Sequence, residues 1–149
     1  MSNLWSGRFS KRMDLLVQDY NASIPFDQVL YKYDIRGSIA HVTMLAEQGI
    51  LSEDESQKII CTLNDIKRDM DKGNFHFKIE DEDIHMAVEA ELIKRIGDVG
   101  RKLHTARSRN DQAVLDTRMY LRDEIKQIYY LLKDLGMAIV DKAKENMDY

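Results

Sequence analysis

Apolar residues recur every three or four positions along much of this chain, which is the spacing that gathers them on one face of an α-helix. The first such stripe follows Asp27, which can cap a helix, and reaches about Gln48. Its members are Leu30, Tyr33, Gly37, Ala40 and Met44. Gly49 then supplies the kind of residue that commonly ends a helix. We therefore predict a helix over residues 27–48.

A second helix is predicted to begin at Ser52, because Ser52 and Glu55 have the spacing of a capping box. Its apolar stripe consists of Ile59, Leu63, Ile66 and Met70. Gly73 ends the pattern, and the two helices should form an antiparallel pair. Cys61 has apolar neighbours here, so we expect it to be buried, and as a lone cysteine it forms no intrachain disulfide.

Residues 74–80 alternate apolar and polar, which is the period of a strand. No second strand is visible to pair with this segment, so we predict an extended connector. A third helix is predicted to open at Asp81–His85 and to end at Gly97. We expect Asp81 and Glu82 in its first turn, where acidic side chains complement the helix dipole.

The last and longest pattern runs from residue 110 to about residue 147 and repeats in heptads. One position of the repeat holds Val114, Leu121, Ile128 and Leu135, and the other holds Ile125, Leu132 and Ile139. A helix of this length extends roughly 55 Å, more than a compact domain of this size can cover. Its apolar seam therefore requires long partner helices.

Residues 1–25 have weak periodicity and end at a helix-breaking segment, Asn21–Pro25. We predict an extended arm followed by a loop. Trp5 and Phe9 have too little sequence around them to be buried locally. The arm should therefore pack on another part of the protein or on another subunit.

Composition narrows the function classes. The chain has 149 residues, is 44% hydrophobic, and carries a net charge of -4, which does not favour nucleic-acid binding. The first residues lack a signal-peptide core, and no apolar run has the length of a membrane span. These features predict a cytoplasmic protein without a membrane partner.

Residues 101–112 combine cationic side chains with small polar ones at the predicted start of the long helix. The cations are Arg101, Lys102, Arg107 and Arg109. A helix N-terminus presents unpaired backbone N–H groups and the positive end of the dipole, so a small anion such as a carboxylate or phosphate is favoured there. The alternative is that Ser108 only caps the helix, with Asp111 completing a short capping box.

The residue sequence of this segment resembles a motif of a known family. Four motifs resemble argininosuccinate lyases of the aspartase/fumarase superfamily, in the family's order: Leu4–Phe9, Asn21–Ile24, Asp81–His85 and His104–Gln112. The resemblance covers essentially the whole chain but only about the N-terminal third of a family member. Ala106 replaces a common glycine, which matters only if the position needs a positive φ.

The resemblance implies an all-α fold, with an N-terminal helical domain and arm over residues 1–109. Residues 110–149 would begin a central helical-bundle domain that is truncated here. Family members are homotetramers in which such helices form a central bundle and each active site draws on three subunits. They cleave argininosuccinate to arginine and fumarate by β-elimination, and no cofactor is implied.

The resemblance also implies which residues contact the substrate: Asn110, Ser23, Ser108, Arg109 and His85. Asp83 and His85 could be read as metal ligands, but a helix places residues two apart on different faces, and we expect no metal site. The family's catalytic histidine and serine lie in Gly-Tyr-Thr-His and Gly-Ser-Ser-x-Met-Pro-x-Lys-x-Asn motifs. Neither occurs in this sequence, so we expect an N-terminal piece that is inactive alone and holds no catalytic residue.

Two alternatives stay open. Another lyase of the superfamily, acting on adenylosuccinate or aspartate, would also release fumarate. A non-catalytic structural protein is the other, because a lens crystallin arose from this family. Only the motifs missing from this sequence would distinguish a crystallin-like member.

Overall fold

The computed structural model describes residues 14–148, and within them every regular element is helical. The all-α prediction is therefore confirmed. The motif Leu4–Phe9 and the arm with Trp5 and Phe9 lie outside the described residues. Contacts divide the chain into a first unit, residues 1–106, and a second unit, residues 107–149, and each is described by itself. The predicted domain division at residue 109 stays a prediction.

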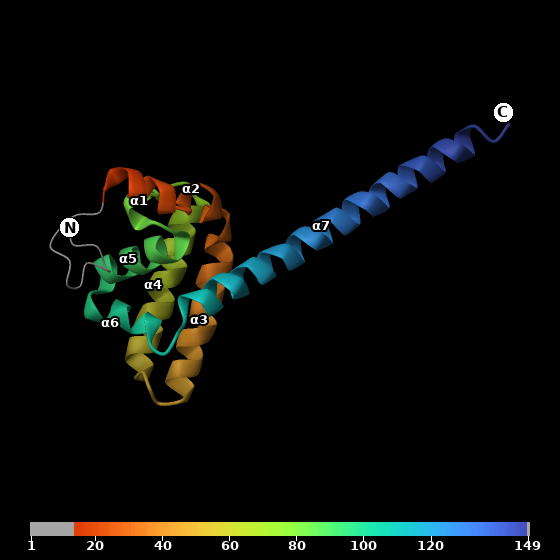
Figure 1. Cartoon of the computed structure of the whole chain (residues 1–149). Helices are drawn as coiled ribbons and strands as arrows, with labels where there is room; N and C mark the ends of the chain where they lie inside the picture. The colour runs from red at the N-terminus through yellow and green to blue at the C-terminus, as the bar shows by residue number, and fades with distance from the viewer. Residues whose placement is uncertain (1–13, 149) are drawn as a thin grey trace. The chain divides into compact units, whose positions relative to one another are not determined.

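The first unit is built on a helical hairpin. Its elements are α1 (Leu15–Asn21), α2 (Ile24–Asp27), η1 (Gln28–Leu30), α3 (Tyr31–Glu47), α4 (Glu53–Asp71), η2 (Ile79–Asp81), α5 (Ile84–Ile96), α6 (Asp98–Arg101) and η3 (Lys102–His104). Helix α3 packs on α4, and α5 packs on both (Figure 1). Where α6 meets α5, a side chain at Gly100 would lie 3.0 Å from the backbone of Ile93, so only glycine fits.

The stripe predicted for the second helix packs with apolar residues of α3 and α5 in one core. The stripe predicted for the first helix was wrong, because Ala40 and Met44 are exposed and the buried face of α3 carries Ile35, Val42 and Leu45 instead. The fully buried members of the core include Ile35, Val42, Leu45, Ile59, Leu63, Ile66, Ile84, Val88 and Leu92. The connector 74–78 is irregular and contributes Phe75 and Phe77, whose ring centroids lie 4.9 Å apart against this core. The preference for a connector over a strand is confirmed for residues 74–78, whereas residues 79 and 80 belong to η2.

The capping-box and glycine motifs of the sequence predicted several helix ends correctly. Ser52 and Glu55 form both hydrogen bonds of a capping box at the start of α4. Gly49 and Gly97 have positive φ at the ends of α3 and α5. These positions need the left-handed conformation that glycine adopts without strain.

Four other local predictions were wrong. Residues 15–21, predicted as extended, form α1, which Asp14 caps by accepting a hydrogen bond from Leu16. Asp27 does not cap α3, because α2 and η1 precede that helix. Asp81 and Glu82 lie before α5 rather than in its first turn. Cys61 is exposed, because it faces away from the stripe of Ile59 and Leu63.

The second unit consists of α7 (Arg109–Glu145), a 37-residue helix of about 55 Å. Both positions of its heptad repeat are largely exposed: Ile128 at the first position is 54% exposed, and Ile125 at the second is 63% exposed. No helix among residues 14–148 combines the length and the apolar composition that a membrane crossing needs.

Candidate functional site

Ser23 is held by backbone and side-chain hydrogen bonds at the start of α2. It occupies the N-cap position, and Pro25 follows in the first turn, where the missing N–H costs nothing. The Ser23 hydroxyl donates a 2.5 Å hydrogen bond to Oδ2 of Asp27. The backbone N–H groups of Ser23 and Ile24 both donate to the carbonyl oxygen of Glu82, at 2.8 and 3.0 Å.

Glu82 forms a strained turn just before α5. Its φ of 64° and ψ of -59° are rare for a residue with a side chain. The N–H of Asp83 donates to the carbonyl oxygen of Asp81 at 2.7 Å, which closes a three-residue γ-turn around Glu82. The turn points the Glu82 carbonyl at the Ser23 loop.

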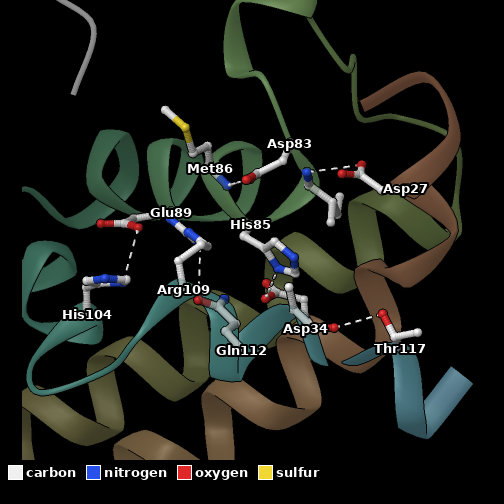
Figure 2. A network of polar contacts seen from close by, with 12 residues as sticks. Asp27, Asp34, Asp83, His85, Met86, Glu89, His104, Arg109, Gln112 and Thr117 are labelled. Atoms are coloured by element: carbon white, nitrogen blue, oxygen red, sulfur yellow. Dashed lines mark hydrogen bonds and ion pairs between the residues drawn. The ribbon is translucent and has the colours of Figure 1, made fainter. Parts of the chain in front are cut away.

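Two carboxylates satisfy backbone N–H groups at the start of α5 (Figure 2). Asp83 accepts from Met86 at 2.6 Å, and Asp27 accepts from Ile84 at 3.2 Å through its second oxygen. Burial raises the pKa of Asp27; the hydrogen bond from Ser23 opposes that rise, while the negative charge of Asp83 adds to it. The Asp27 carboxylate thus joins the Ser23 loop to the α5 N-terminus.

His85 lies in the first turn of α5 and is buried, with 5% of its surface exposed. Its Nδ1 lies 2.8 Å from Oδ1 of Asp34, which comes from α3 and is 1% exposed (Figure 2). Asp83 turns instead to the backbone of Met86. Asp83 and His85 therefore have separate partners, as the helix geometry predicted.

The structure brings Ser23 and His85 to the same end of α5, although 62 positions separate them in the sequence. The connecting residues are Asp27 and Glu82, which both contact the Ser23 loop. Sequence reasoning missed Asp27 and Asp34 as site residues. The available signal for Asp34 was a charged residue beside the apolar stripe of its helix.

The other three predicted site residues lie together at the N-terminus of α7. Ser108 is at the N-cap position, but its side chain makes no capping hydrogen bond, so the simple capping interpretation is wrong. Arg109 donates to Oε1 of Gln112 at 3.0 Å (Figure 2), and Asn110 is exposed in the first turn. Two amide or hydroxyl groups and a guanidinium thus gather at a helix N-terminus, where a carboxylate is favoured.

Part of the predicted cationic cluster is already neutralised within the first unit. Lys102 contacts Oε1 of Glu55 at 2.5 Å, and Arg101 contacts Asp98 at 3.3 Å. The Lys102 hydrogen bond is the main reason that the pKa of Glu55 is lowered. Lys102 and Arg101 are therefore poorer candidates for binding a small anion than the sequence suggested.

The backbone between η3 and α7 is itself strained. Ala106 has a φ of 54°, so the position does need the conformation that the family's usual glycine would adopt freely. Just before it, the carbonyl oxygen of Thr105 lies 2.9 Å from Nε2 of His41 on α3. His41 therefore has a structural role.

The comparisons with known proteins cover nearly the whole chain. A family model described as "Lyase" matches residues 7–149. Proteins named argininosuccinate lyase from Pelotomaculum thermopropionicum and Acetivibrio thermocellus are 53% and 54% identical over 146 and 145 residues, which is 98% and 97% of this chain. Each match covers 32% of the relative, so the chain spans about a third of these proteins. The match to the family model across residues 7–149 shows that this chain belongs to the lyase family.

Proposed function

We propose that the protein containing this chain is an argininosuccinate lyase of the cytoplasm, which cleaves argininosuccinate to arginine and fumarate by β-elimination. One observation carries the proposal. Relatives with that name are 51–54% identical to the chain over 96–98% of its length. The whole protein would be a homotetramer, since α7 has an exposed apolar seam that long partner helices could cover.

The reaction requires removal of a proton from the carbon beside a carboxylate, which places a second negative charge on that group. Fixed donors and cations must stand where this charge develops. Asn110, Ser108 and Arg109 are suited to this task because a helix N-terminus and a guanidinium both favour a carboxylate. We assign them to substrate binding.

Ser23 and His85 are assigned to substrate binding as well. The Ser23 hydroxyl lies at the start of α2, and the His85 imidazole lies in the first turn of α5. Both are held by neighbours in the first unit: Ser23 by Asp27 and Glu82, and His85 by Asp34. Such fixed groups lose little freedom when substrate binds. The catalytic acid and base are assigned to parts of the relatives that this chain does not match.

The test is fumarate release by a protein of the relatives' length that contains this chain. Argininosuccinate, adenylosuccinate and aspartate are supplied separately. We expect fumarate from argininosuccinate alone, accompanied by an equal amount of arginine. Fumarate from adenylosuccinate or aspartate instead would replace the proposed substrate within the superfamily, and no release from any of them would favour a structural protein.

A further inference from the structure

Asp34 and His85 form a buried pair, of which His85 is a proposed substrate contact and Asp34 is not. Oδ1 of Asp34 and Nδ1 of His85 lie 2.8 Å apart, and both residues are at least 95% buried. The pair links the first turns of α3 and α5. Figure 2 shows the imidazole edge directed at the carboxylate.

The contact would decide which ring nitrogen carries a proton if Asp34 is ionised. An ionised carboxylate only accepts hydrogen bonds, so Nδ1 would then be the donor, in the neutral imidazole as well as in the cation. Nε2 is then either an acceptor or, in the cation, a second donor. Without such a partner the ring would be free to adopt the other tautomer.

The position of His85 makes this partner more important. The positive end of the α5 dipole disfavours an imidazolium in the first turn. The negative groups that oppose it are Asp34 on α3, Asp27 on α2 and Asp83 at the α5 N-cap. Of these three groups, Asp34 is hydrogen-bonded to the ring.

A purely stabilising role explains the pair poorly. The same two helices already share an apolar core that includes Ile35, Val88 and Leu92. A buried ion pair adds little net stability compared with apolar side chains of similar volume, because both groups lose their hydration. Stability alone therefore does not explain a carboxylate at position 34, whereas an effect on the chemistry of His85 would.

We propose that Asp34 is a positioning residue, which holds Nδ1 of His85 protonated and the ring oriented so that Nε2 meets the substrate. The proposal rests on the proposed function only in assigning a substrate contact to His85. Carboxylates that orient a working histidine through its other nitrogen commonly affect activity about 10- to 100-fold or more.

The first measurement is the tautomer itself. Long-range 15N–1H spectra of histidine-labelled protein distinguish an Nδ1–H from an Nε2–H imidazole, and His85→Asn identifies the signal. We expect Nδ1–H in the unaltered protein and partial or full conversion to Nε2–H in Asp34→Asn. An Nε2–H form of His85 in the unaltered protein would overturn the proposal, whether or not Asp34→Asn folds.

The second measurement is a double-mutant cycle on kcat/KM in the protein of full length. Asp34→Asn should lower kcat/KM about 10- to 100-fold with His85 present and should have no further effect in a His85→Asn background. Equal effects in both backgrounds would mean that Asp34 does not act through His85. The matched control is Tyr31→Phe, which removes a hydrogen bond from α3 to Asp71 and should change neither the tautomer nor kcat/KM.

The two proposals fail in different ways. Normal kcat/KM in His85→Asn would remove His85 from substrate binding, whatever the spectra show. A wrong tautomer would refute the role of Asp34 even if argininosuccinate is cleaved as proposed.

Discussion

The backbone N–H of Ser23 donates a 2.8 Å hydrogen bond to the carbonyl oxygen of Glu82, a residue held at a φ of 64°. A strained residue thus positions the loop that carries a proposed substrate contact. Residues in sparsely populated backbone regions cost about 1–3 kcal/mol and persist where the surroundings impose them. The surroundings here are the Ser23 and Ile24 N–H groups and the start of α5.

Replacing Glu82 by glycine should relieve this strain. Glycine loses more conformational entropy on folding, which costs about 0.5–1 kcal/mol and offsets part of the strain energy of about 1–3 kcal/mol. We therefore expect Glu82→Gly to stabilise the first unit by about 1 kcal/mol. Urea unfolding measures the change. The matched control is Glu80→Gly in η2, where φ is not positive, and it should destabilise. Equal destabilisation by both substitutions would contradict a strained Glu82.

Ala106 offers a second test of backbone strain. Its φ of 54° costs an alanine roughly 1–2 kcal/mol, and glycine tolerates the same conformation. We expect Ala106→Gly to raise the free energy of unfolding by about 1 kcal/mol. Ala40→Gly, at an exposed position inside α3, should lower it by about 1 kcal/mol. The idea fails if thermal or urea denaturation gives the two substitutions the same sign.

The fold was predictable where short-range signals decide the structure. The capping box of Ser52 and Glu55 and the glycines at 49 and 97 are local, and they placed helix ends correctly. Helix α1 was missed because its segment has no apolar stripe and none of its residues is buried. The burial of Cys61 was misjudged because apolar neighbours in sequence do not show which face of a helix a side chain occupies.

The candidate site was predictable only in part. Family motifs marked Ser23 and His85, but their partners come from other elements. Asp34 reaches His85 across 51 positions, and the Glu82 carbonyl reaches Ser23 through a γ-turn that no turn motif indicates. Such contacts depend on how α2, α3 and α5 pack, which the periodicity of a single segment does not contain.

Tyr31 should make the stability of the first unit depend on alkaline pH. Burial, together with the hydrogen bond to Asp71 and the charge of that residue, raises the pKa of Tyr31 to about 12. Because the folded-state pKa lies above the unfolded value of about 10, this contribution is complete below pH 10 and is lost as pH rises toward 12. The difference in unfolding free energy between the unaltered chain and Tyr31→Phe should therefore shrink across that range. A constant difference would contradict the raised pKa.

Asn110 tests the proposed binding of substrate at the α7 N-terminus. Its exposed side chain stands in the first helical turn, so Asn110→Ala removes a donor without opening a cavity. If the amide stabilises the charge that develops on the substrate carboxylate, kcat should fall by about 10²- to 10³-fold, the usual loss for one such donor. Argininosuccinate cleavage by the protein of full length is measured together with its helical content, which should not change. Asn64→Ala is the matched control, since that amide donates only to the Ile60 carbonyl on an exposed face of α4 and its loss should leave kcat unaltered. Near-normal turnover in Asn110→Ala would remove this residue from the site. Ser108 and Arg109 would then be the proposed hydrogen-bond donors to the substrate carboxylate.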